Sequence, residues 1–476
     1  MTRSEGGWFA PALVLAVFVT VARLVLLAFN RTDLFVDESQ YWFWGQSFAF
    51  GYYSKPPLIA WVIGAVTSLA GSDSTFWVRA PGPVFHGATA LILGALAARL
   101  GGRRAALWVT ASYLTLPMVA LGSLLISTDT IMAPFFAAAL YFHLRLTETR
   151  AGIFALLAGV MAGLAFLAKY AAVYFVLGAV LGSILIPAMR IPLRQWLLML
   201  GAFVAAISPN ILWNLNNGLA TAEHTMDNVG WVREAQPLSN LNPGGMAEFF
   251  LSQFAVFGPV LFAALLWAVF RGAENRARRL LVFVVPPVVL VSIQALLNQA
   301  YANWAASAYF AGTVVAVAVL LPRPRWLSAS LAIGTTLSLA LPIVTLMPWL
   351  DLGGQPVLQR YLGRTDLSLQ ILALAKERGL PVVTDRRDVI ADLFYTGRDT
   401  GVALYAAPPH GRPTSHYEQS YALPNSVQGD VLYVAATPPS CGNAPTVQAL
   451  DTSGGAYAKL SLSAYVVDAG CLHADE

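Results

Sequence analysis

Two acidic residues and a lysine lie close together near the start of the chain, in an unusually aromatic segment. Asp37 and Glu38 are adjacent, and Lys55 follows 17 residues after Glu38, in front of two prolines. Nine aromatic residues occur between Phe35 and Tyr53. A carboxylate can take a proton from a hydroxyl group, and a lysine ammonium is a natural partner for a phosphate. These residue types at this spacing predict that the protein acts on a lipid-linked anionic substrate.

Two short helices are expected to position these groups. Residues 39–47 form a predicted helix whose aromatic density fits the headgroup zone of a membrane. Residues 58–70 are apolar but too short to span, so they predict a second interfacial helix that Ser54 caps and Pro56 or Pro57 opens. Two alternatives stay open. The acidic pair can cap the first helix and form its first turn, and Lys55 can be a snorkelling anchor.

The composition places these helices in a membrane protein. Of 476 residues, 57% are apolar and 11% are charged, whereas a soluble domain carries roughly 25% charged residues. Disorder, a fibrous protein and an ordinary soluble enzyme are excluded. The net charge of +4 does not indicate nucleic-acid binding, because the basic residues are scattered between apolar runs.

Apolar runs long enough to span recur over the first 350 residues. The predicted spans are 8–29, 76–99, 104–122, 128–146, 152–168, 170–188, 195–213, 246–270, 280–297, 302–321 and 326–348. We therefore expect an α-helical polytopic protein with about 11 to 13 transmembrane helices. The first run is expected to remain a membrane helix and not a cleaved signal peptide, because Arg23 interrupts it and no A-x-A site follows.

The loop charges predict the orientation. With a cytoplasmic N-terminus, fourteen Lys and Arg residues fall on the inner side of residues 1–349 and five on the outer side. An odd number of spans then places residues 350–476 outside. That region holds 13 of the 25 acidic residues and predicts a small α/β domain, with helices at 366–378 and 386–396 and strands at 381–384, 401–406, 430–436 and 461–467.

Both cysteines of the chain, Cys441 and Cys471, lie in this second region. Two cysteines confined to an exported domain predict a disulfide, with two unpaired buried thiols as the alternative. The predicted domains are thus 1–349, the transmembrane part, and 350–476, a periplasmic α/β domain.

The acidic pair followed by Lys55-Pro56-Pro57 resembles the polyprenyl-phosphate-dependent glycosyltransferases of the GT-C fold. These include bacterial lipid A aminoarabinose transferases and protein O-mannosyltransferases. Further matching pieces are Arg79-Ala80-Pro81, Ser127-Thr128-Asp129, Gly163-Leu164-Ala165 with Lys169-Tyr170, and Pro209-Asn210-Ile211-Leu212-Trp213-Asn214. The resemblance covers most of the chain. Ser54 stands where aminoarabinose transferases usually have glutamate, which argues against an aminoarabinose donor but not against the class.

The resemblance implies transfer of a sugar from a polyprenyl phosphate to an acceptor hydroxyl on the outer side of the inner membrane. The leaving group is a phosphate, which needs positive charge more than a proton. Asp37 is the expected catalytic base, with inversion at the anomeric carbon. Glu38 is expected to orient the acceptor or hold the loop, and Lys55 to contact the phosphate.

Further residues are expected to bind substrate: Tyr41, Tyr53, Arg79, Asp129, Lys169, His224 and Arg233. Arg79 can instead pair with the acidic pair or anchor a helix end. Asp129 can be a helix cap and Lys169 an interfacial anchor. His224 can bind the donor, help to hold a metal or be an ordinary loop histidine. Arg233 lies in a long loop, 214–245, that is expected to act as a lid over the donor.

No ATP-binding, dinucleotide-binding or zinc-protease motif occurs in the sequence. The sequence therefore indicates no definite cofactor. A divalent metal stays an open alternative. The expected partners are the polyprenyl-phosphate-linked donor, a lipid or protein acceptor, and membrane lipids. The main alternative is a transporter or flippase of a lipid-linked sugar. That class predicts internal pseudo-symmetry and ionisable groups near the bilayer midplane, whereas the charges of this chain cluster at the outer rim.

Overall fold

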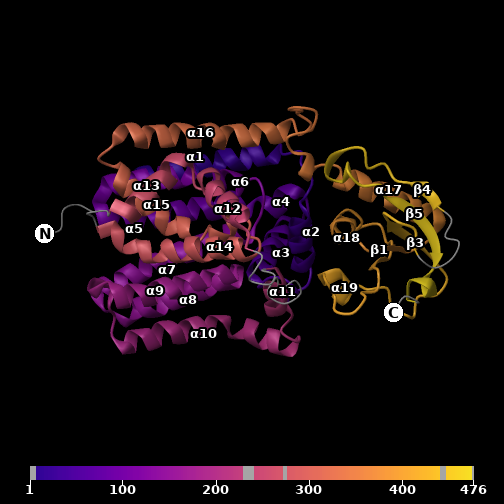
Figure 1. Cartoon of the computed structure of the whole chain (residues 1–476), viewed down its shortest axis with the longest axis horizontal. Coiled ribbons are helices and arrows are strands. Elements are labelled where there is room, and N and C mark those ends of the chain that lie inside the picture. Colours follow the sequence, from indigo (N-terminus) through magenta and orange to yellow (C-terminus); the bar gives the residue numbers. More distant parts are fainter. Residues whose placement is uncertain (1–6, 229–240, 272–275, 440–445, 474–476) are drawn as a thin grey trace. The chain divides into compact units, whose positions relative to one another are not determined.

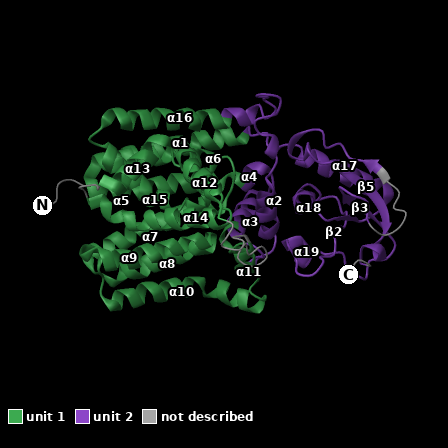
Figure 2. Cartoon of the chain, in the orientation of Figure 1, with its two compact units in different colours: residues 1–28, 55–59, 79–342 green, residues 29–54, 60–78, 343–476 purple. Residues whose placement is uncertain are grey.

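The computed structural model describes residues 7–228, 241–271, 276–439 and 446–473. Its contacts divide the chain into two compact units (Figure 2): unit 1 comprises residues 1–28, 55–59 and 79–342, and unit 2 comprises 29–54, 60–78 and 343–476. Unit 2 therefore combines the loop after the first helix with the C-terminal region. The amino-acid composition does not indicate that these two segments belong to one unit. The predicted domain boundary at residues 349/350 stays a prediction.

Unit 1 is a bundle of helices (Figure 1). Its helices are α1 Phe9–Ala28, α5 Pro81–Leu114, α6 Pro117–Leu121, α7 Thr128–Thr149, α8 Gly152–Ala168, α9 Val173–Leu185, α10 Leu193–Asn216, α11 Ala220–Asn228, α12 Pro243–Val256, α13 Pro259–Arg271, α14 Val285–Leu297, α15 Ala308–Leu320 and α16 Pro324–Leu346, the last ending in unit 2. Short 3-10 helices lie at η1 Tyr170–Ala172, η2 Pro187–Met189 and η4 Ala302–Ala305, and a longer one at η3 Arg276–Phe283.

Small residues allow the helices of unit 1 to pack closely. Helix α8 lies against both α7 and α10. A Cβ atom added to Gly159 would collide with the Met199 carbonyl of α10, and one added to Gly163 would lie 2.5 Å from the Ala206 Cβ. Such glycines let the backbones of two apolar helices approach closely. The resulting van der Waals contacts stabilise helix association inside a membrane, where the hydrophobic effect between helices is weak.

The membrane-spanning character of unit 1 follows from its helices. In the part of the chain that the structure describes, five helical stretches are long and apolar enough to cross a membrane by length and composition, among them α1, α10 and α16, and the bent pair of α12 and α13 is a sixth if it forms one span. The protein is therefore a polytopic membrane protein, while the predicted total of eleven spans stays a prediction.

The span predicted over 246–270 is bent, which the sequence analysis did not indicate. α12 and α13 meet at an angle of 116°, because Gly258 takes a left-handed backbone (φ +91°) and Pro259 cannot continue the preceding helix.

Unit 2 combines a five-stranded sheet with several helices (Figure 1). The strands are β1 Val382–Thr384, β2 Leu404–Ala406, β3 Asp430–Ala435, β4 Thr446–Ala449 and β5 Ser463–Asp468, in the order β2-β1-β3-β5-β4. β1 pairs in parallel with β2 and β3, and β5 pairs antiparallel with β3 and β4. The predicted α/β character is confirmed, although β4 was not predicted.

The helices of unit 2 include both predicted helices of the first loop. They are α2 Val36–Gly45, α3 Leu58–Ala70, which begins in unit 1, α4 Thr75–Arg79, α17 Arg364–Arg378, α18 Arg387–Thr396 and α19 His416–Ser420, with 3-10 turns η5 Gln359–Tyr361, η6 Gly455–Tyr457 and η7 Ala469–His473. The cap predicted for the second helix is not at Ser54. α3 begins at Leu58, and the Ser54 hydroxyl instead lies 3.4 Å from Gln40 Nε2.

Helix α18 is apolar on two sides, and this explains how α2 is held. Val389 and Leu393 pack into the core of the sheet. Ile390 and Ala391 belong to a separate cluster with Val36 of α2. One helix thus joins the sheet to the helix that carries the acidic pair.

A buried carboxylate on the same helix predicts a pH-dependent stability. Asp392 is 1% exposed, and its Oδ2 accepts hydrogen bonds from Ser368 (2.7 Å) and Thr396 (2.9 Å). Among the described residues its Oδ1 has no hydrogen-bond partner. Burial raises the pKa of Asp392 to about 6. The folded protein thus holds this proton more tightly than the unfolded chain, so the stability that Asp392 contributes is present at low pH and is lost as the pH rises from about 4 to 6.

We therefore expect Asp392→Asn to raise the free energy of unfolding by about 1–3 kcal/mol at pH 7–8, with the gain vanishing toward pH 4. The measurement is the apparent Tm in detergent as a function of pH. Asp399→Asn is the control, because the Asp399 side chain is 89% exposed. A constant difference between variant and wild type at every pH would contradict the prediction.

Candidate active site

Glu38 caps the helix that carries the acidic pair. The residue before α2 is Phe35, whose backbone N–H donates to Glu38 Oε2 at 2.8 Å. Glu38 is 2% exposed. A carboxylate at this position satisfies a free N–H group and interacts favourably with the positive end of the helix dipole. The geometry favours the expectation that Glu38 holds the loop over the expectation that it orients an acceptor.

Asp37 points away from this cap and meets an arginine from the C-terminal region. Asp37 Oδ1 lies 2.5 Å from Arg387 Nη2, and the two side chains are 43% and 42% exposed. The Nε of the same guanidinium donates to Gln40 Oε1 at 3.0 Å. Both acceptors stand on α2, so one guanidinium contacts two consecutive turns of that helix.

Sequence reasoning missed Arg387, although a signal was present. Arg387 is the first residue of α18 and lies three residues after the end of β1. The carboxyl ends of parallel strands are where α/β folds gather functional side chains. Partial burial lowers the pKa of Arg387, but the charge of Asp37 and its hydrogen bond raise it more, so the net shift is upward.

The aromatic residues of the first loop pack mainly within unit 2. Tyr41, Trp42, Trp44, Tyr52 and Tyr53 are each at most 6% exposed. The Phe43 and Phe394 rings lie 4.4 Å apart. The Tyr53 hydroxyl donates to the Pro413 carbonyl at 2.8 Å. Of the nine aromatics, Phe48 and Phe50 stand out as exposed, at 71% and 42%. Their density therefore serves packing between α2 and the C-terminal region more than contact with a headgroup zone.

A histidine lies beside this aromatic cluster. His416 of α19 is 5.6 Å from the Trp44 ring, centroid to centroid. Burial, with a smaller contribution from the charge of Arg387, lowers the pKa of His416 to about 4. His416 is therefore neutral at physiological pH and adds no positive charge beside Asp37.

A second polar cluster lies in unit 1. Lys169 Nζ contacts both carboxylate oxygens of Asp129 at 2.7 Å, and Asn303 Nδ2 donates to Asp129 Oδ2 at 2.9 Å. The expectation that Asp129 caps its helix is wrong, because Ser127 is the cap of α7 and accepts from the Thr130 N–H. Contacts of this pair with substrate stay a proposal.

The Asp129–Lys169 pair gives a stability prediction. Its side chains are 15% and 18% exposed, so removing one partner leaves the other charge poorly solvated. We expect Asp129→Asn and Lys169→Met each to cost about 1–3 kcal/mol, and the double variant to cost less than their sum. The measurement is a double-mutant cycle of apparent Tm in detergent. Arg99 and Glu148, a pair that is 24% and 30% exposed, form the control cycle, with an expected coupling below about 1 kcal/mol. Strict additivity at Asp129 and Lys169 would refute the prediction.

The remaining candidates are placed as follows. Lys55 is half-buried and stands before Pro56 and Pro57, ahead of α3. Arg79 ends α4 and is 1% exposed. His224 is half-buried on α11.

Two candidates cannot be placed. Arg233 and Cys441 lie outside the described residues, so the lid and the disulfide stay predictions. Cys471 lies on η7, and no free cysteine occurs in the described part of the chain.

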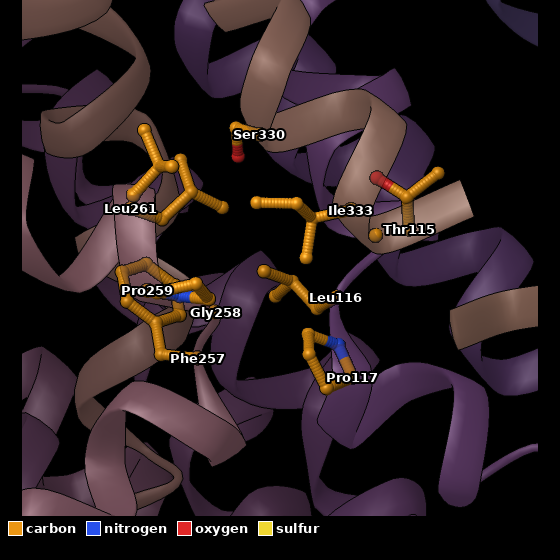
Figure 3. Close-up of a pocket in the computed structure, with 11 residues that line it drawn as sticks. Thr115, Leu116, Pro117, Phe257, Gly258, Pro259, Leu261, Ser330 and Ile333 are labelled. Atoms are coloured by element: carbon orange, nitrogen blue, oxygen red, sulfur yellow. The ribbon is translucent and has the colours of Figure 1, made fainter. Parts of the chain in front are cut away.

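Two further features bear on the chemistry. Within the described ranges, no group of three or more His, Cys, Asp and Glu residues is arranged to hold a metal ion. A cavity in unit 1 is lined by residues 115–117, 257–261, 330, 333 and 334 (Figure 3). These described lining residues include no ionisable side chain, so the cavity offers no acid–base chemistry.

Comparison with known structures identifies the class of protein. The chain is similar to ArnT from Cupriavidus metallidurans in the apo state, with a TM-score of 0.62 and 13% identity over 98% of this chain and 99% of that one. The structure of that protein bound to undecaprenyl phosphate matches with the same TM-score and identity, over 97% and 98% of the two chains. The fold is therefore that of the GT-C glycosyltransferases.

Sequence comparison identifies the family. Residues 54–213 match the family model described as dolichyl-phosphate-mannose-protein mannosyltransferase. The chain is also 43% identical over 471 residues to the lipid A galacturonosyltransferase RgtD of Rhizobium johnstonii, which covers 97% of this chain and 98% of that protein. The chain belongs to this family of polyprenyl-phosphate-sugar-dependent glycosyltransferases. The predicted resemblance and enzyme class are thus confirmed, and the transporter alternative is not supported.

Proposed function

We infer that this glycosyltransferase moves galacturonic acid from a polyprenyl phosphate to a hydroxyl group of lipid A. The observation that carries the proposal is the 43% identity, over almost the whole chain, to a lipid A galacturonosyltransferase. Undecaprenyl phosphate, which the structurally similar ArnT binds, is the proposed carrier. Ser54 agrees with an acidic sugar, because it places no carboxylate next to Lys55, where a second negative charge would repel a uronic acid.

The proposed reaction is a single displacement at the anomeric carbon of the donor. The bond from this carbon to the phosphate oxygen breaks, and its electron pair leaves with the polyprenyl phosphate. The acceptor oxygen forms the new bond, and its proton passes to the carboxylate of Asp37. Lys55 stabilises the charge that develops on the phosphate. Asp37 suits the base because 43% of its side chain is exposed, so an acceptor hydroxyl can approach it.

The proposed location is the bacterial inner membrane, with a cytoplasmic N-terminus. The excess of arginines in the inner loops supports this orientation. It places the first loop and the C-terminal region in the periplasm, where acceptor and donor would meet.

The test is a transfer assay with purified protein in liposomes. Undecaprenyl phosphate carrying galacturonic acid is compared with undecaprenyl phosphate carrying aminoarabinose, each with lipid A as acceptor, and the products are read by mass spectrometry. The expected result is modified lipid A with the first donor and little or none with the second. Transfer to protein, or preference for aminoarabinose, would overturn the proposed acceptor or sugar.

A further inference from the structure

The guanidinium of Arg387 is fixed by two contacts on one helix. Its Nη2 lies 2.5 Å from Asp37 Oδ1, and its Nε donates to Gln40 Oε1 at 3.0 Å. Gln40 is 1% exposed and stands three residues after Asp37, on the same face of α2. Because two different nitrogens of the planar guanidinium are engaged by two side chains of α2, both its position and its plane are set relative to the Asp37 carboxylate.

The backbones that carry these side chains are also held together. Ile390 and Ala391 of α18 are buried in one cluster with Val36 of α2, and Phe394 packs on Phe43. An ion pair whose side chains are about 40% exposed contributes little to stability when both side chains must lose conformational freedom to form it. Here much of that ordering is already supplied by the packing of α18 on α2. The pair is therefore a fixed feature of the site and not an incidental surface contact.

The same contacts continue toward the second expected substrate-binding segment. Gln40 Nε2 lies 3.4 Å from the Ser54 hydroxyl, and Ser54 immediately precedes Lys55 in the chain. Arg387 thus stands in a series of polar contacts, Asp37–Arg387–Gln40–Ser54. The series ends at the residue that precedes Lys55 in the chain.

We propose that Arg387 is a positioning residue for Asp37, holding the carboxylate ionised and oriented toward the acceptor hydroxyl. This inference rests on the proposed function, in which Asp37 is the base. It also assigns to the C-terminal region a positioning role in catalysis, in addition to packing. Arg387 acts through Asp37 and needs no contact with the substrate.

The surrounding titratable groups determine what a pH profile reports. Around Arg387 these are Asp37 and Tyr41 of α2 and His416 and Tyr417 of α19. Both tyrosines carry hydroxyls that titrate far above the range of a carboxylate. His416 shares the acidic range with Asp37, so a His416→Gln background is needed to assign the acid limb to Asp37.

The experiment measures kcat/KM for transfer between pH 4 and 9 in the full-length protein. In Arg387→Gln the acid limb of the pH–rate profile is expected to move to higher pH by about 1 unit or more, because the positive charge that favours the ionised form of Asp37 is gone. The rate should fall most at the acid end of this range, by up to about 10-fold for each pH unit that the limb moves, and much less at pH 8. Arg387→Lys keeps the positive charge but loses the planar guanidinium. The acid limb of its pH–rate profile should therefore stay near that of wild type, while kcat falls. The shift should persist when His416→Gln is added.

Arg386→Gln is the matched control. It removes the same type of side chain one position earlier, at the N-cap of α18, where the arginine pairs with Asp388 (2.9 Å), and its profile should match wild type. An equal loss of rate at every pH in Arg387→Gln, with an unmoved limb, would mean a structural role only and would overturn the inference. Asp37→Asn separates the two proposals. If it still transfers at the wild-type rate, the assigned base is wrong. If it is inactive while Arg387→Gln has an unmoved limb, the inference about Arg387 alone fails.

Discussion

Asp37→Asn is expected to lower kcat for sugar transfer by about 100- to 10,000-fold, the range that a positioned general base contributes. The substitution keeps the shape of the side chain and an oxygen that can accept from Arg387. It removes the ability to take a proton. The fall should therefore appear in kcat, while affinity for the donor changes little, because the lost interaction exists only when the acceptor oxygen attacks.

The measurement pairs single-turnover transfer with separate binding of labelled donor, using protein of matched apparent Tm. Asp388→Asn is the control, since it makes the same chemical change on α18 in a carboxylate that pairs with Arg386. A rate in Asp37→Asn within a factor of a few of wild type would show that another group takes the proton. A large loss of donor binding with an unchanged kcat would instead make Asp37 a binding residue.

Local patterns predicted most of the secondary structure around this site. The period of apolar residues predicted a helix at 366–378, and the structure has α17 at Arg364–Arg378. The aromatic segment after Asp37 was predicted to be helical, and α2 spans Val36–Gly45. These elements depend on neighbours three or four residues away, which is why a single sequence contains the necessary information.

The misjudged elements depend on single residues or distant partners. The run at 246–270 is mostly apolar, so composition predicted a span and gave no sign of the 116° turn at Gly258 and Pro259. β4 is four residues long and pairs with β5 through an irregular register. So short a strand forms because β5 offers it an edge, and its own residues carry too little periodicity to indicate it.

Contacts between side chains that are distant in the sequence could not be predicted either. The sequence indicated Asp37 through its type and its spacing from Lys55. It did not indicate Arg387, which lies 350 residues further along the chain, because pairing across that distance is set by how α18 packs on α2. Asp129 and Lys169 were both singled out, but their ion pair across 40 residues was not foreseen for the same reason.

Lys55→Ala is expected to lower kcat/KM by about 100- to 1,000-fold, comparable to the loss of one essential donor to a developing oxyanion. The donor is a phosphodiester with a single negative charge. When its bond to the sugar breaks, the departing polyprenyl phosphate gains further negative charge. A cation beside it therefore stabilises the transition state more than the bound donor, and most of the loss should fall on kcat.

The comparison of Lys55→Ala with Lys55→Arg tests this reasoning. Arginine keeps the charge but changes its reach and geometry, so we expect it to recover part of the rate. Lys459→Ala, which removes an exposed lysine of the C-terminal region, should leave transfer unchanged. If Lys55→Ala raises only the KM for the donor, the lysine binds donor and transition state equally. The charge on the leaving phosphate must then be stabilised by another cation. Arg79, at the end of α4, is the first to substitute in that case, because a guanidinium can bind a phosphate through two parallel N–H groups.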